Sequence, residues 1–210
     1  MASAADRLDF HTDRIDADAF SRNTLGNMYL RSGMPREAVS EYQTALEIGR
    51  RFPLQHWGEV EVMVRKNMVR ALYSLTDFRT AEQHLEVLEA NRGDDPEVRL
   101  LRGLHHLWHH DFDRAGRLFR GLLDAGYVTP EALVGFGWCQ VEAGSFEAAM
   151  RTFRQALEGD PGDLSALSGL AYVELFGRKN PRAAQRVAEN VLRLQWDQPR
   201  AHEVLGHVMM

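Results

Sequence analysis

The apolar residues of this chain recur at steps of three and four, which is the spacing of one face of an α-helix. In one segment Leu133 and Phe136 share such a face, and Ala149 and Phe153 share another after a turn. No segment alternates apolar and polar residues as a half-buried strand does. Glycine, serine, aspartate and proline separate the periodic segments. The pattern therefore predicts an all-α chain of short helices joined by tight turns.

The helical segments repeat at a nearly fixed period. Ala81, Ala115 and Ala149 each follow an aromatic-bearing turn and are separated by 34 residues. Ala38 precedes Ala81 by 43 residues, and a similar alanine follows at 183 or 184. A period of this length is typical of stacked helix hairpins. We therefore expect five hairpins, with an insertion of about nine residues after the first.

Small and large residues occupy fixed places in these units. A small residue stands twelve positions before the alanine, where two helices can approach closely, and a large residue stands four after it. The small residues are Gly26, Gly103, Gly137 and Ala171, with Val69 as the exception, and the large ones are Tyr42, Leu85, Phe119 and Phe153. Each hairpin then has apolar residues on more than one side, so it must stack on its neighbours.

The fourth unit, PEALVGFGWCQVEAGSFEAAMRTFRQALEGDP, resembles a nearly complete tetratricopeptide repeat. The first unit is similar through Gly26, Tyr29, Ala38 and Tyr42, while the second and third are looser. The resemblance covers about residues 19–208, although the family's tryptophan at the fourth repeat position is missing throughout. It implies a right-handed α-solenoid of stacked helix–turn–helix hairpins.

The resemblance also divides the chain. We expect an N-terminal segment that is partly helical or disordered, five repeats, and a capping helix or truncated sixth unit. The longer first spacing indicates a lengthened second helix from Ala38 to Arg51, ending at Phe52-Pro53. The expected ranges are 1–18 for the N-terminal segment, 19–61, 62–95, 96–129, 130–163 and 164–197 for the repeats, and 198–210 for the last helix.

Composition narrows the function classes. The formal net charge of −5 does not favour nucleic-acid binding, which usually requires a basic surface. A single cysteine excludes a fold that is held together by disulfide bonds. The uncharged stretches are too short for a membrane span, and the opening MASAAD does not read as a secretory signal. A cytoplasmic location is the default expectation.

No constellation of catalytic residues is recognisable, so we expect no enzyme activity and no cofactor. His105 and His109 are four residues apart on one predicted helix, which is metal-capable spacing, but the repeat pattern favours core and turn roles for this histidine cluster. His202 and His207 are five apart and miss the spacing of a zinc-peptidase motif. Cys139 lies in an apolar helical segment, so we expect its thiol to be buried and unreactive.

In tetratricopeptide-repeat proteins the first helices of the units line a concave groove. Here the resemblance implies a groove that is polar and locally basic in the first two units, and apolar and aromatic in the other three. The residues that it places there are Asn27, Arg31, Lys66, Asn67, Arg70, Tyr73, Leu100, Leu101, Leu104, Trp108, Val134, Trp138, Val141, Tyr172, Leu175 and Phe176. A shift of the repeat register by one residue, or filling of the groove by the chain's own N-terminal segment, would alter this assignment.

The sequence therefore predicts a non-enzymatic scaffold or adaptor that binds a protein partner, an apolar or amphipathic peptide or helix, in its groove. Three alternatives stay open. The chain could be a chaperone of the secretion type, a metal-binding protein built on the histidine cluster, or a structural subunit. The last would form homo-oligomers through Val204, Leu205, Val208 and Met209 of its final helix.

Overall fold

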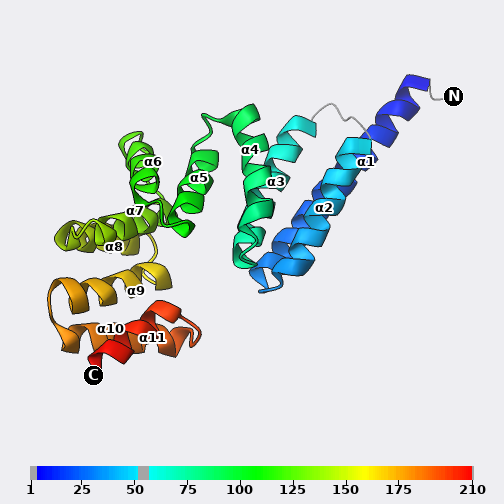
Figure 1. Ribbon diagram of the computed structural model, residues 1–210. Helices are drawn as coiled ribbons and strands as arrows, with labels where there is room; N and C mark the ends of the chain where they lie inside the picture. Colours follow the sequence, from blue (N-terminus) through cyan, green and yellow to red (C-terminus); the bar gives the residue numbers. More distant parts are fainter. Residues whose placement is uncertain (1–3, 52–56, 210) are drawn as a thin grey trace. The chain divides into compact units, whose positions relative to one another are not determined.

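The computed structural model describes residues 4–51 and 57–209, with side chains from Asp18 onward. All regular elements in these ranges are helices, and they follow one another as pairs joined by short turns (Figure 1). The chain is an all-α solenoid of stacked hairpins, as the sequence predicts. It divides within one helix into two compact units, unit 1 (residues 1–101) and unit 2 (residues 102–210), which we describe separately.

Unit 1 contains two complete hairpins. Each helix packs on the next one, and the first helices of the two hairpins also touch each other. The helices are α1(Ala4–Arg31), α2(Pro35–Arg51), α3(Trp57–Ser74) and α4(Phe78–Arg92), followed by the start of α5(Pro96–Trp108). The division between the units falls inside α5.

The long first repeat differs in detail from the expectation. α2 does end at Arg51, but the expected stop at Phe52-Pro53 lies outside the described residues. α3 begins at Trp57, five residues before the expected start of the second unit, so the insertion lengthens α3 as well as α2. Residues 4–18 continue into α1 as helix.

Unit 2 stacks the remaining hairpins in the same way. Its elements after α5 are α6(Phe112–Asp124), α7(Pro130–Glu142), α8(Phe146–Gly159), α9(Leu164–Tyr172) continued by a π-helical turn η1(Val173–Gly177), α10(Pro181–Leu194) and α11(Pro199–Val208). From α6 onward successive helices pack on each other, and α7 also touches α9, which in turn touches α11.

Local sequence signals explain where these helices begin and end. Asp77, Asp111, Asp163 and Asn180 each accept a hydrogen bond from the backbone N–H three residues on, which caps the following helix. His110 stands in the turn where the fourth unit has Gly144, and it takes the same left-handed backbone, with φ of 58°. The turn role that the repeat pattern predicts within the histidine cluster is thus confirmed for His110.

The alternation of small and large residues builds the core. In unit 1 the buried ring of Tyr42 lies directly against Gly26. In unit 2 the buried ring of Phe153 lies between Gly137 of α7 and Gly169 of α9. One large side chain of a second helix therefore fills the space left by small residues on two successive first helices.

Candidate functional site

The polar face expected in unit 1 is neutralised within the chain. Lys66 Nζ lies 2.5 Å from Asp95 Oδ2 and 3.1 Å from Glu97 Oε2, while Arg70 Nη2 lies 3.3 Å from Glu97 Oε1. Burial alone would lower the pKa of Lys66, but the hydrogen bonds to Asp95 and Glu97 raise it. The expectation of a locally basic groove is therefore wrong for Lys66 and Arg70, because carboxylates 27 to 31 residues further along the chain pair with them.

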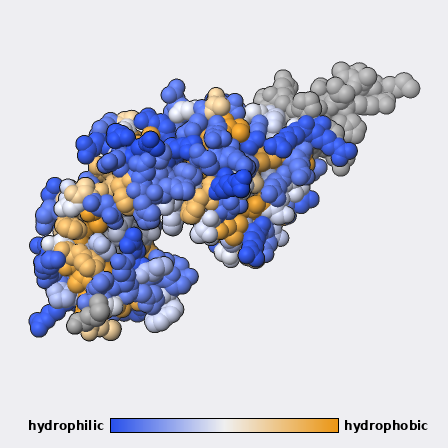
Figure 2. All heavy atoms as spheres, in the orientation of Figure 1, coloured by the Kyte–Doolittle hydropathy of each residue, from blue (hydrophilic) through white to orange (hydrophobic). Residues whose placement is uncertain are grey.

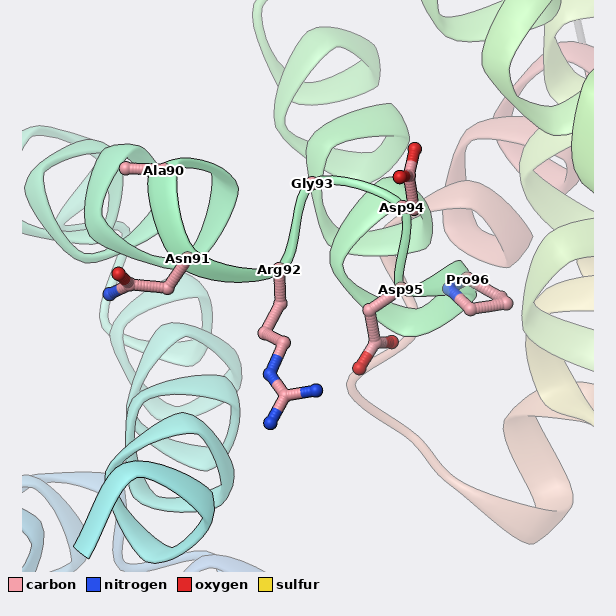
Figure 3. Close-up of a pocket in the computed structure, with 7 residues that line it drawn as sticks. All are labelled: Ala90, Asn91, Arg92, Gly93, Asp94, Asp95 and Pro96. Atoms are coloured by element: carbon pink, nitrogen blue, oxygen red, sulfur yellow. The ribbon is translucent and has the colours of Figure 1, made fainter.

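One of these carboxylates, that of Asp95, also organises the turn between α4 and α5. Asp95 Oδ1 accepts hydrogen bonds from the backbone N–H groups of Glu97 and Val98, at 2.8 Å and 3.4 Å. Residues 90–96 line a hollow of about 630 Å³ at this turn, in which the side chains of Arg92 and Asp95 point to one side and that of Asp94 to the other (Figure 3). Burial alone would raise the pKa of Asp95, but the hydrogen bonds from Lys66 and from the backbone lower it. This turn fixes Asp95 as the partner of Lys66.

Other expected groove residues of unit 1 also serve the fold. Asn67 Nδ2 donates to Oδ1 of the buried Asn23 at 2.9 Å, and Asn27 Oδ1 accepts from the Tyr42 hydroxyl at 2.7 Å. Arg31 is exposed in the last turn of α1. These amides hold α1 to α3 and to α2.

Three residues that the sequence places on the groove surface are buried. Tyr73 is 8% exposed, and its hydroxyl donates to the backbone carbonyl of Leu101 at 3.1 Å. Leu100 and Leu101 are 1% and 0% exposed. The placement of these leucines on the groove surface is wrong, because both belong to the core.

A buried polar cluster in unit 1 has no counterpart in the sequence-based prediction. Arg65, 6% exposed, donates to Glu61 Oε1 from Nε at 2.8 Å and from Nη2 at 2.6 Å, and its Nη1 lies 2.9 Å from His84 Nδ1. Burial and the neighbouring charge of Arg65 lower the pKa of His84 to about 4. Arg65 stands at the repeat position of the family's missing tryptophan, which is the one sequence signal that could have identified it.

Unit 2 contains an apolar hollow of about 440 Å³. Its walls come from the end of α5, from α7, from the first turn and a half of α9, and from the start of α11. Four of the predicted groove residues line it, namely Leu104, Trp108, Val134 and Trp138. Leu107, Phe112, Ser165, Ser168 and Arg200 complete much of the wall. In Figure 2, orange apolar side chains also interrupt the hydrophilic surface in the region of α7–α9.

The aromatic residues near this hollow form a connected row. The ring of Trp138 lies 5.6 Å from that of Tyr172, and the ring of Tyr172 lies 4.4 Å from that of Phe176. The ring of Phe176 in turn lies 5.1 Å from that of His207 on α11. Edge and tilted contacts of this kind hold aromatic rings in fixed orientations.

The remaining groove candidates of unit 2 lie in or near the core. Val141 is 5% exposed and packs with Phe153, so it does not line the surface that the sequence predicts. Leu175 is half-buried against the α9–α10–α11 core. Trp108, in contrast, is 53% exposed while lining the hollow.

The histidine cluster lies at the end of α5. The rings of His105 and His109 have their centroids 4.5 Å apart, and His106 Nδ1 lies 3.6 Å from Asp111 Oδ2. Among the residues that the structure describes, no three His, Cys, Asp or Glu side chains are grouped to hold a metal ion.

Two features bear on the alternatives of self-assembly and membrane association. Val204 is fully buried in the core between α9, α10 and α11, and Leu205 and Val208 pack against that core, so only Met209 of the expected assembly surface is strongly exposed. Across residues 4–51 and 57–209, none of the helices has the length and apolar character needed to cross a bilayer.

Comparison with known proteins identifies the repeat. Residues 100–163 match the sequence model of the tetratricopeptide repeat. A search of curated protein sequences finds no significant match to this chain.

Solved structures of low sequence identity share the fold. The chain is similar to the Cut9–Hcn1 hetero-tetramer of the APC/C, with a TM-score of 0.73 and 16% identity over 91% of this chain but only 36% of that one. It is also similar to TTC0263, a thermophilic TPR protein of Thermus thermophilus, with a TM-score of 0.69 and 12% identity over 91% of this chain and 98% of that one. A third similar structure is YrrB, described as a TPR protein with an unusual peptide-binding site, with a TM-score of 0.52 and 16% identity over 90% of this chain and 92% of that one.

Proposed function

We propose that the chain is a tetratricopeptide-repeat protein and a non-enzymatic scaffold that binds a protein segment in the hollow of unit 2, a proposal supported by the match of residues 100–163 and by the shared fold. The segment is an apolar or amphipathic peptide or helix. The observation that carries this proposal is the hollow itself, because Leu104, Trp108 and Trp138 present apolar and aromatic surface in a concave site.

The character of the wall supports a protein partner. Aromatic side chains anchor partner residues more strongly than other apolar groups, since they bury a large area with few rotatable bonds. Ser165, Ser168 and Glu142 add polar groups at the same hollow. An apolar anchor with a few polar contacts beside it is what an amphipathic segment requires.

The polar face of unit 1 is a weaker candidate. Lys66 and Arg70 already pair with Asp95 and Glu97, so a partner's carboxylate would have to displace those ion pairs. We therefore assign recognition to unit 2.

Selection of peptides on the immobilised protein, followed by measurement of their Kd, tests this assignment. We expect Trp108→Ala to weaken the selected peptides at least about tenfold, because it removes an anchor of the wall while leaving the core intact. Trp196→Ala is the matched control, since Trp196 is 73% exposed and does not line the hollow. Peptides that bind the Trp108→Ala and wild-type proteins equally well would overturn the proposal, provided that circular dichroism shows the same helix content in both.

A further inference from the structure

Arg200 lies over the ring of Trp138, which lines the hollow, and over the adjacent ring of Tyr172. Its guanidinium carbon is 4.9 Å from the centroid of the Trp138 ring and 5.9 Å from that of Tyr172. The two rings are 5.6 Å apart and inclined at 69° to each other, so they form two walls of a cage. These distances fall within the range of cation–π attraction.

Two carboxylates lie near the rings of Trp138 and Tyr172. Arg200 Nη1 lies 3.0 Å from Glu203 Oε2, and Glu142 lines the hollow beside Trp138. Burial, followed by the charges of Glu203 and Glu142, raises the pKa of the Tyr172 hydroxyl, while Arg200 opposes this effect. Two acidic groups thus act on the cage against one guanidinium, which makes it a favourable place for a cation.

The contact with Arg200 is exchangeable. The side chain of Arg200 is 47% exposed, and that of Glu203 is 38% exposed. Cation–π contacts and ion pairs are both weak at exposed sites, because water competes for the charged groups. A partner that brings its own cation together with apolar contacts can therefore displace Arg200.

We propose that Trp138 and Tyr172 form a subsite for the guanidinium of an arginine on the bound segment, and that Arg200 closes this subsite in the free chain. The proposal rests on the function assigned above and names the chemistry that the partner presents there. Arginine fits better than lysine, because its planar guanidinium stacks on aromatic faces and is less strongly hydrated. Leu104 and Leu107 of α5 line the same hollow and fit apolar residues that flank the arginine.

A chemical rescue experiment tests the subsite without a known partner. The variant Arg200→Ala empties the cage, and ethylguanidinium is then titrated while the indole N–H signal of Trp138 is followed by NMR. We expect a saturable shift in Arg200→Ala that is at least about fivefold weaker in the wild type, where Arg200 competes. Ethylurea, a neutral analogue of similar shape, should give no saturable shift. The exposed Trp196 supplies the non-specific response within the same spectrum.

Three results would overturn the subsite. These are no shift of Trp138 in Arg200→Ala, an equal shift with ethylurea, or an equal shift in the wild-type protein. If Arg200→Ala loosens α11, Arg200→Gln gives a second variant that keeps a side chain of similar length, and circular dichroism reports the fold of both.

Measurements of peptide affinity can distinguish a failure of the arginine subsite from a failure of the proposed function. For a peptide selected on the hollow, Arg200→Ala should tighten the version that contains arginine about fivefold and leave a version with glutamine in its place unchanged. If both versions need Trp108 but neither responds to Arg200→Ala, the hollow binds peptides and the arginine subsite is wrong. If the peptides ignore Trp108, the proposed function is wrong, and the ethylguanidinium titration still decides the subsite.

Discussion

The ring of Phe153 lies so close to Gly169 that a Cβ atom at position 169 would be 2.4 Å from Cζ of the ring. The same ring would meet a Cβ atom at Gly137 at 2.6 Å from Cε1. Phe153 is fully buried, and it joins the hairpin of α7 and α8 to the following helix α9. The contact therefore couples successive repeats in unit 2.

We expect Gly169→Ala to lower the free energy of unfolding by about 1–3 kcal/mol, because a methyl group cannot fit without moving the ring. Alanine in a helix would otherwise gain up to about 1 kcal/mol over glycine. Gly206→Ala is the matched control, since its Cβ would meet no atom within 4 Å. Urea unfolding of both variants measures the difference, and a Gly169→Ala protein as stable as the control would contradict this packing.

The 34-residue period predicted the hairpins, the turns and the small and large positions at which Gly137 and Phe153 are found in contact. Such features follow from local spacing, because the same backbone geometry recurs in every repeat. The same spacing places Trp108 and Trp138 on first helices of their hairpins, and both line the hollow of unit 2.

Contacts between long polar side chains could not be predicted in this way. Lys66 pairs with Asp95, which lies 29 residues further along the chain. Arg200 contacts the ring of Trp138, which belongs to a helix two hairpins earlier. Leu100 and Leu101 were misplaced on a surface, since the repeat pattern gives a position on a helix but not how deeply neighbouring helices cover it. A single sequence contains no signal for these rotamers and depths.

Lys66 should contribute to stability through its two carboxylates. Lys66→Met leaves Asp95 and Glu97 close together beside Arg70, and we expect a loss of about 1–2 kcal/mol in the free energy of unfolding. Arg22→Met is the control, because Arg22 is 47% exposed in its pair with Glu41, and exposed ion pairs contribute little to stability. Equal effects of the two variants in urea unfolding at low salt would argue against the network.

Cys139 should be unreactive in the folded protein. Its side chain is buried in α7, and burial raises the pKa of the thiol to about 12. Because the thiolate is the reacting species, we expect Ellman's reagent at about pH 8 to react at least about 100-fold more slowly with the native chain than with the chain in urea. As the chain has one cysteine, Cys139→Ala gives the blank. A fast reaction under conditions where circular dichroism shows full helix content would contradict the burial.

His84 should make unit 1 less stable in acid. In the folded chain its pKa is about 4, against 6.5 when exposed, so below pH 6.5 the unfolded chain binds a proton that the folded chain does not. Stability is therefore complete above the unfolded pKa and falls as the pH drops from 6.5 towards 4. Because His84 is only half-buried, part of this effect is screened, and we expect a loss of about 1 kcal/mol between about pH 7 and pH 5.

His84→Gln isolates this contribution, because glutamine retains an acceptor for Arg65 but does not titrate. The free energy of unfolding, measured in urea at both pH values, should fall less for His84→Gln than for the wild type by that amount. The carboxylates elsewhere in the chain titrate equally in both proteins, so their effect cancels in the comparison. An identical pH dependence of the two proteins would show that the pKa of His84 is the same in the folded and unfolded chains, which would contradict its burial beside Arg65.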